Sequence, residues 1–319
     1  MTLSPHDLLT LLGAVVLAGI GGELFLKGVL GAAVALRVPK LLVATSLAAF
    51  ATSSPELTVS TVAALAGAPE IGLGDALGSN VVNIALLFGL ALMLGPIRIE
   101  RRELGRDFAL ALGLPLLTFW FATDSVISRS EGSVLLVIFA LWMGTLIRAG
   151  LTAREAREVD ANDPATEIPP AWRSLLLGMA GLAALVAAGH LFVAGATSIA
   201  TAFGVDAYIV GATVVAIGTS LPELVTVLLA RPRGHDDVGV GTLLGSNLFN
   251  GMAIVGIAAT IHPIAVPTRE IAVALGMGLF SLLLLIPGRD GVIGRGRGVV
   301  LLAGYGAFVA AILAAGRAA

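Results

Sequence analysis

The sequence predicts an all-α membrane protein of ten transmembrane helices, arranged as two repeats of five helices that enter the membrane from opposite faces. Three observations predict this fold. Of the 319 residues, 57% are hydrophobic and 13% are charged, with a mean hydropathy of +0.98, whereas soluble domains carry about 25% charged residues. Apolar segments long enough to cross a bilayer recur along the chain. Two polar motifs recur inside these segments with the same spacing of 167 residues.

Ten apolar segments meet the length of about 20 residues that a helix needs to cross the hydrocarbon core. The predicted spans are 8–33, 40–66, 72–95, 107–123, 131–149, 173–201, 207–230, 239–262, 269–287 and 297–315. Between the fifth and sixth spans the chain is rich in charged residues and proline. We therefore expect a first unit over 1–150, a linker over 151–172 and a second unit over 173–319.

The basic residues are distributed unequally between the two sides of this topology. Of the 19 Lys and Arg residues, 15 fall in loops on one side and three on the other, while Lys27 lies within a span. The positive-inside rule makes the richer side cytoplasmic, together with the linker, and places both termini outside. Because five spans is an odd number, the second unit then has inverted topology, as in many transporters. This predicts a multi-pass protein of the cell (inner or plasma) membrane.

Other compositional features exclude several classes of partner and site. A net charge of −2 gives no indication of nucleic-acid binding, and the absence of cysteine excludes disulfides and thiolate metal sites. The first seven residues contain no Lys or Arg, which argues against a cleaved signal peptide.

The first motif joins a helix-breaking proline to an acid. Thr-Ser-Ser-Pro-Glu-Leu over 52–57 recurs as Thr-Ser-Leu-Pro-Glu-Leu over 219–224. Proline lacks an N–H, so Pro55 and Pro222 should each break a helix and free the carbonyl four residues earlier. Unwound backbone at membrane depth is tolerated where it lines a cavity. Each break therefore places a glutamate beside free carbonyl oxygens, which hard cations such as Ca²⁺ and Na⁺ prefer.

The second motif supplies hydroxyl and amide oxygens. Leu-Gly-Ser-Asn-Val-Val-Asn over 77–83 recurs as Leu-Gly-Ser-Asn-Leu-Phe-Asn over 244–250. The serine and the last asparagine of each copy are four residues apart, on one helix face. Inverted units should bring all four motif copies together at mid-membrane, where two carboxylates balance one Ca²⁺ or two Na⁺. Asn80 and Asn247 either join this site or hydrogen-bond within the scaffold.

Other polar residues of the spans are weaker candidates for ion binding, and for Glu23 and Lys27 we expect a structural or gating role. Glu23 and Lys27 are i,i+4 neighbours that can pair on one helix. Asp75 and Asp206 lie near the starts of spans and are expected at the membrane interface. The segment 160–164 lacks the central glycine and the terminal glutamate of a calcium-binding loop, so we expect it to be part of the linker.

With these motifs identified, the two repeats resemble the α1 and α2 repeats of the cation/calcium antiporter superfamily, and most closely its prokaryotic sodium/calcium exchangers. The resemblance implies that Glu56 and Glu223 are the central calcium-ligating carboxylates. The full set of implied ion ligands is Ala49, Thr52, Ser53, Glu56, Ser79, Asn83, Ala216, Thr219, Ser220, Glu223, Ser246 and Asn250. One position departs from archaeal exchangers, which tend to have Asp where this chain has Asn250.

The resemblance implies a secondary antiporter that exports Ca²⁺ in exchange for Na⁺ by alternating access, with the first and sixth spans sliding over a static core. Protons remain an alternative counter-ion, although the calcium/proton branch has a G-N-x-x-E form in place of T-S-x-P-E. A cation channel is an alternative from a different class. An intramembrane enzyme is not expected, because His190 and the serines form no protease pattern. No cofactor beyond the transported ions and no required protein partner are expected.

Overall fold

The structure, a computed structural model, describes residues 5–36, 38–67, 69–98, 101–159, 170–202, 216–266, 268–288 and 290–315. Helices lie within all ten predicted spans, with the range 207–215 of the seventh outside the described residues. Among these described residues, five helical stretches are long and apolar enough to cross a membrane. They are Leu12–Leu36, Gly72–Leu94, Arg129–Thr152, Ala171–Leu191 and Asp236–Ile261. Lys40–Thr52 and Ile271–Leu284 are shorter apolar helices, so the crossing of all ten segments stays a prediction.

The first half of the chain contains the following elements in order. They are α1 (Pro5–Leu36), α2 (Lys40–Val43), the π-helix η1 (Ala44–Ala48), α3 (Ala49–Thr52), α4 (Ser54–Leu65), α5 (Pro69–Val81), the π-helix η2 (Val82–Phe88), α6 (Gly89–Leu94), β1 (Ile97–Arg98), α7 (Arg101–Phe121), the 3₁₀ turn η3 (Ala122–Asp124), β2 (Val126–Ile127) and α8 (Arg129–Val159).

The second half repeats much of this order. Its elements are α9 (Ala171–Ala202), α11 (Ala216–Thr219), α12 (Leu221–Ala230), the 3₁₀ turn η5 (Arg231–Arg233), α13 (Asp236–Phe249), the π-helix η6 (Asn250–Ile254), α14 (Val255–Ile261), β3 (Ile264–Ala265), α15 (Thr268–Leu284), β4 (Val292–Ile293) and α16 (Arg295–Ala315).

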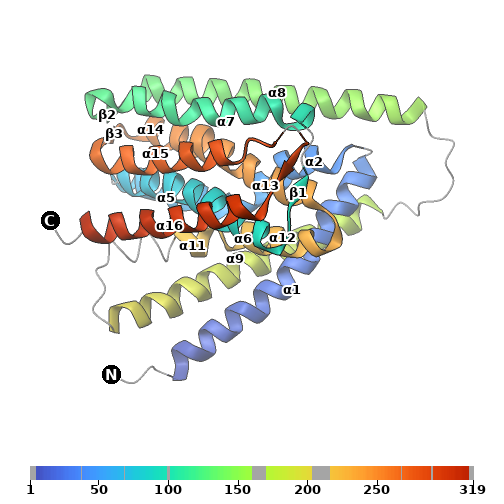
Figure 1. Ribbon diagram of the computed structural model, residues 1–319, viewed down its shortest axis with the longest axis horizontal. Coiled ribbons are helices and arrows are strands. Elements are labelled where there is room, and N and C mark those ends of the chain that lie inside the picture. The colour runs from blue at the N-terminus through green and yellow to red at the C-terminus, as the bar shows by residue number, and fades with distance from the viewer. Residues whose placement is uncertain are drawn as a thin grey trace.

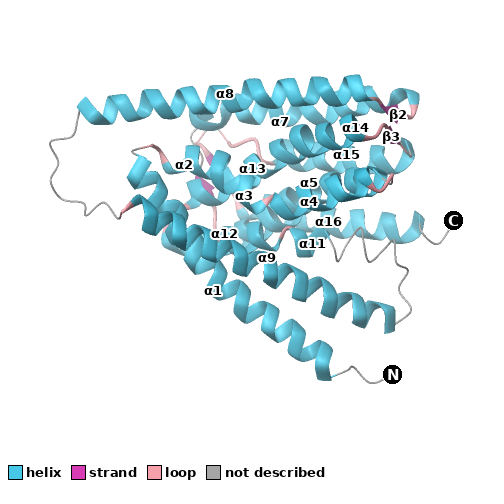
Figure 2. Ribbon diagram, turned by 180° about the vertical axis from the view of Figure 1, so that it is seen from behind, coloured by secondary structure: helices cyan, strands magenta, loops and turns pink. Residues whose placement is uncertain are grey.

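Two short strand pairs join the halves. β1 pairs antiparallel with β4, and β2 pairs antiparallel with β3. Each pair therefore takes one strand from each half, and β1 and β3 are themselves 167 residues apart. β2 and β3 lie at one end of the molecule, whereas β1 lies toward the other end (Figures 1 and 2).

The helices α1 and α9 run side by side along one edge, tilted against the remaining helices (Figure 1). Their contact depends on glycine. A Cβ added at Gly28 would lie 2.4 Å from the backbone nitrogen of Gly178, and one at Gly181 would lie 2.3 Å from that of Phe25. Small residues let membrane helices approach closely in this way. The two helices thus form a tightly packed pair.

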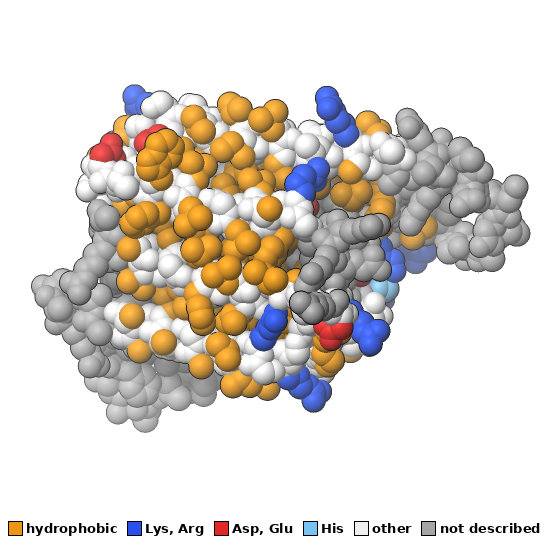
Figure 3. All heavy atoms as spheres, turned by 45° about the horizontal axis from the view of Figure 1, so that its top comes forward, with side chains coloured by type: hydrophobic (Ala, Val, Ile, Leu, Met, Phe, Trp, Pro, Cys, Tyr) orange, Lys and Arg blue, Asp and Glu red, His pale blue; other side chains and the backbone are white. Residues whose placement is uncertain are grey.

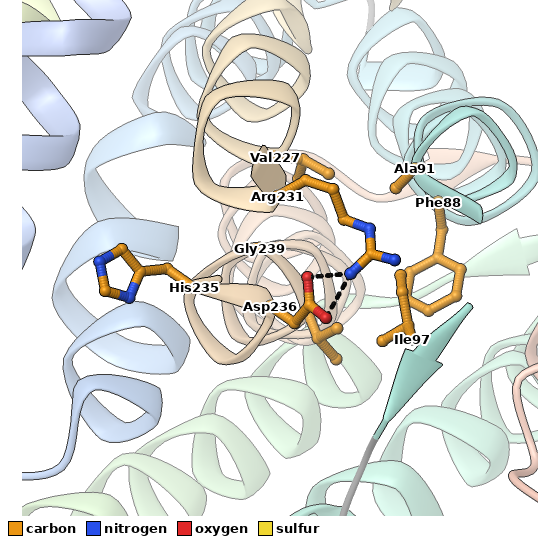
Figure 4. Close-up of a pocket in the computed structure, with 9 residues that line it drawn as sticks. Phe88, Ala91, Ile97, Val227, Arg231, His235, Asp236 and Gly239 are labelled. Atoms are coloured by element: carbon orange, nitrogen blue, oxygen red, sulfur yellow. Dashed lines mark hydrogen bonds and ion pairs between the residues drawn. The ribbon is translucent and has the colours of Figure 1, made fainter. Parts of the chain in front are cut away.

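Arg231 links the two halves of the chain by hydrogen bonds near the strand pair β1–β4. Arg231 pairs through Nη1 with the carboxylate of Asp236 (Figure 4). Its Nη2 donates to the carbonyl of Pro96, the residue before β1. Lys40 Nζ donates to Nδ1 of the neighbouring His235 at 3.3 Å. Burial, together with the charge of Lys40, lowers the pKa of His235, so the neutral ring can accept this hydrogen bond.

The surface of the described residues is apolar over its middle. Leu141 of α8 is 67% exposed and Trp120 of α7 is 68% exposed, with further large apolar side chains along the same helices. Hydrophobic side chains spread across the face in Figure 3, and most of the visible Lys and Arg gather toward one end. Soluble monomers rarely expose large contiguous apolar patches. The apolar surface of the described residues therefore fits a protein surrounded by lipid.

Candidate cation site

The two proline motifs produce the same break in the backbone. Ser53 separates α3 from α4 at φ −84° and ψ 10°, and Ser220 separates α11 from α12 at φ −82° and ψ 10°. The carbonyl of Ala51, which Pro55 cannot bond, accepts instead from Ser54 Oγ at 2.7 Å. A neighbouring hydroxyl therefore replaces the lost donor in the first repeat, where the second repeat has Leu221.

The breaks bring the two glutamates into one buried region. Glu56 is 1% exposed and Glu223 is fully buried. Ser220 Oγ donates to Glu56 Oε1 at 3.5 Å, and Ser53 Oγ donates to Glu223 Oε1 at 3.4 Å. Each carboxylate is thus held by the serine of the other repeat. This reciprocal arrangement brings the two proline motifs together, as the sequence predicts.

The second motif contributes its own contacts to this region. Ser246 Oγ donates to Glu223 Oε1 at 3.0 Å and lies 3.4 Å from Thr52 Oγ1. Asn80 Nδ2 donates to the backbone carbonyl of Asn247, while Asn247 Nδ2 donates to that of Asn80. Asn83 Nδ2 donates to Asn247 Oδ1 at 3.0 Å. Asn247 and the Nδ2 of Asn80 therefore hold the scaffold, while Asn80 Oδ1 is buried without a partner among the described residues.

Several buried oxygens in this region have no hydrogen-bond partner among the described residues. They are Glu56 Oε2, Glu223 Oε2, Ser79 Oγ, Asn83 Oδ1 and Asn250 Oδ1. Leaving such groups unpaired costs about 1–3 kcal/mol each, and more for charged groups. The set combines carboxylate, amide and hydroxyl oxygens from both repeats, and Ca²⁺ takes about six to eight such ligands. These residues fit a hard cation.

Two π-helices present the amides of this set. η2 contains Asn83, and η6 begins at Asn250, its counterpart 167 residues later. A π-helix widens the helical turn and is often found at functional sites. The sequence pattern did not predict these turns.

The two alanine carbonyls are already engaged. The Ala49 carbonyl accepts from the backbone N–H of Ser53 at 3.0 Å and from Thr52 Oγ1 at 3.3 Å. The Ala216 carbonyl accepts in the same way from Ser220 N–H and Thr219 Oγ1, both at 3.2 Å. A sodium ion at either carbonyl would use its second lone pair or replace the threonine hydroxyl.

One acidic residue lies nearer to this region than the sequence indicated. Thr219 Oγ1 donates to Asp75 Oδ1 at 3.5 Å, and Asp75 Oδ2 is buried. The expectation of an interfacial Asp75 is therefore wrong, because contact between α5 and α11 places it against the motif. Asp206 lies outside the described residues. The predicted pair of Glu23 with Lys27 is present at 3.2 Å.

Comparison with known proteins decides the family. The family model described as "Sodium/calcium exchanger protein" matches residues 6–148 and 173–314, which is most of the chain and leaves out the linker. The chain belongs to this exchanger family.

Exchangers and membrane proteins of this family resemble the chain over nearly its full length. The inner membrane protein YrbG of Escherichia coli is 32% identical, with 84% of this chain and 85% of that protein aligned. The sodium/calcium exchanger MaX1 of Methanosarcina acetivorans is 28% identical over 96% of this chain and 98% of that protein. A solved structure of the sodium-calcium exchanger NCX_Mj superposes with a TM-score of 0.79 at 27% identity, covering 95% of this chain and 98% of that one. The protein is thus a membrane antiporter of the exchanger family with the NCX_Mj fold.

Proposed function

We propose that this protein exchanges Ca²⁺ for Na⁺ by alternating access, with both ions binding between Glu56 and Glu223. The observation that carries the proposal is the set of buried oxygens without partners around these two carboxylates. A buried carboxylate needs a compensating charge, and the nearest donors to both glutamates are neutral hydroxyls. A transported cation supplies this charge.

The charge of the site supports competition between the two ions. Two carboxylates carry −2, which one Ca²⁺ or two Na⁺ neutralise. Both are hard cations that share the same oxygen ligands, so one set of side chains can bind either ion but not both fully. Mutually exclusive occupancy is what an antiporter needs, and it distinguishes this proposal from a cation channel.

We infer further that the two units are inverted repeats of five spans each. This inference is supported by strand pairs that each take one strand from either half at separate ends of the molecule. It is supported also by the matching backbone angles at Ser53 and Ser220. We further propose that the end with β1 and β4 faces the cytoplasm and that both termini lie outside, because most of the Lys and Arg residues of the loops fall on that side of the predicted topology.

The moving part in this proposal is the helix pair of α1 and α9. The pair packs tightly within itself through glycine and lies at the edge of the remaining helices (Figure 2). α1 and α9 also contact α12, which begins at the second backbone break. Sliding of the pair would therefore expose the glutamates alternately to either side, in the direction of Ca²⁺ export when Na⁺ enters.

The test is uptake of ⁴⁵Ca²⁺ into proteoliposomes in which sodium and pH gradients are imposed separately. We expect uptake when the vesicles are loaded with Na⁺, and no uptake from a pH gradient alone. Uptake that follows the pH gradient and ignores sodium would establish proton exchange instead. Uptake without any counter-ion gradient, driven by membrane potential alone, would indicate a channel.

A further inference from the structure

We propose that Asp75 is a third anionic ligand of the cation site and that it adds a sodium position beside Glu56 that calcium does not need. This inference rests on the proposed exchange of calcium for sodium. Asp75 belongs to α5 and reaches the second repeat through the hydroxyl of Thr219, with 3.5 Å between Oγ1 and Oδ1.

The hydroxyl of Thr219 has more hydrogen-bond acceptors within reach than it can donate to. Its hydroxyl carries one hydrogen, yet it lies within reach of the Ala216 carbonyl at 3.2 Å and of Asp75 at 3.5 Å. The next residue, Ser220, donates to Oε1 of Glu56. One hydroxyl can donate to only one acceptor at a time, and both distances exceed the usual 2.7–2.8 Å or so for such bonds. The negative charge at this point is therefore not compensated by the described residues.

Two carboxylate oxygens beside Thr219 and Ser220 are buried without a hydrogen-bond partner among the described residues. They are Asp75 Oδ2 and Glu56 Oε2. The two carboxylates repel each other, which makes their joint burial unfavourable unless a cation lies between or beside them. Asp75 as a whole is only half-buried, whereas Glu223 is fully buried.

The two repeats differ at the position of Asp75. Asp75, Ser79 and Asn83 are spaced i, i+4 and i+8, whereas the second repeat has Thr242, Ser246 and Asn250 at the same positions. In the second motif copy, Ser246 bonds to Glu223 and contacts Thr52. The corresponding Ser79 hydroxyl has no partner, because Thr219 bonds to Asp75 instead.

The balance of charge assigns the ion. Glu56 and Glu223 already neutralise one Ca²⁺, and Asp75 adds a single negative charge. Three carboxylates match three monovalent cations, so the additional ligand favours the sodium-loaded form over the calcium-loaded form.

The experiment measures how Na⁺ displaces bound ⁴⁵Ca²⁺ from the purified protein. Asp75→Asn keeps the shape of the side chain and its bond to Thr219 but removes the charge. We expect the sodium concentration for half-displacement to rise by about tenfold, as for the loss of one charged ligand contact, and the Hill coefficient for Na⁺ to fall. Calcium affinity without sodium should change by less than about threefold. Asp75→Thr, which introduces the residue found at the equivalent position of the second repeat, should change the sodium and calcium values in the same way as Asp75→Asn.

The matched control is Glu70→Gln, which removes one charge from the exposed first turn of the same helix. If Asp75→Asn and Glu70→Gln give the same displacement curve, the assignment is wrong. An equal loss of calcium and sodium affinity would also overturn it, because Asp75 would then serve both ions. Failure of Na⁺ to displace ⁴⁵Ca²⁺ from the unaltered protein would instead refute the proposed exchange itself.

Discussion

Replacing Glu223 by glutamine should separate the role of its charge from the role of its shape. Ser246 and Ser53 donate to Oε1, and the amide oxygen of glutamine can accept both bonds. The ion-free protein should therefore lose nothing on substitution, because the variant removes a buried charge whose second oxygen has no partner. We expect its thermal unfolding midpoint without ions to equal or exceed that of the unaltered protein.

The response to calcium should change in the opposite sense. Losing one member of a buried charge pair costs about 3–5 kcal/mol, which weakens calcium binding by about 150- to 5,000-fold. At a calcium concentration 100 times the dissociation constant, the unaltered protein gains about 2.7 kcal/mol. At the same concentration, a variant weakened about 150-fold gains only about 0.3 kcal/mol.

The assay is thermal denaturation of the purified protein with and without Ca²⁺, combined with ⁴⁵Ca²⁺ uptake. Glu56→Gln should give the same result, since Glu56 has the same burial and an equivalent serine donor. The exposed Glu70→Gln serves as control. A Glu223→Gln variant that is still stabilised by calcium like the unaltered protein would refute the assignment of this carboxylate as a ligand. A large loss of ion-free stability would show that the carboxylate is structural.

Three further predictions concern topology, proton linkage and the moving helices. Cysteines introduced at Thr2 and Thr166 should be labelled by an impermeant reagent in intact cells, with any outer membrane permeabilised, only at position 2; the reverse pattern would invert the proposed orientation. Asn250→Asp adds an ionisable group among the unpaired oxygens and should steepen the pH dependence of exchange or alter sodium affinity, whereas no change in either would place position 250 away from the ions. Glu23→Gln removes the ion pair that joins α1 to Arg233 of η5. Because such exposed pairs contribute about 0–1 kcal/mol, transport rates should change by less than about fivefold with unchanged calcium affinity, and a complete loss of transport would contradict this estimate of the contact.

The sequence predicted the features that depend on local chemistry. Hydropathy located the helices because a span must be apolar over its full length. Proline predicted the breaks because its missing N–H acts within one turn, and Ser53 and Ser220 show almost identical angles. The duplicated glutamates were recognisable because an acid is rare in such apolar surroundings.

The remaining features depend on contacts between distant segments. Asp75 stands near the start of a span, so its sequence position favoured the interface, but packing of α5 against α11 brings it to Thr219. Its spacing of four from Ser79 was a signal available in the sequence. The π-helices at Asn83 and Asn250 could not be predicted, because one additional residue in a turn leaves no distinct hydrophobic period.

The two halves differ in a way that bears on how ions leave the site. Glu56 and Glu223 occur at equivalent positions and each accepts from the serine of the other repeat, so in the proposed exchange calcium would meet one carboxylate from each half. Asp75 has Thr242 as its counterpart, and a sodium ion held there is bound to one half only. If the helix pair moves as proposed, that ion would be exposed first toward the end of the molecule that carries α5 and β3, which are in contact. Under the proposed orientation this end faces outward, so the off-centre sodium ion is the first to bind from outside and the last to be released inside.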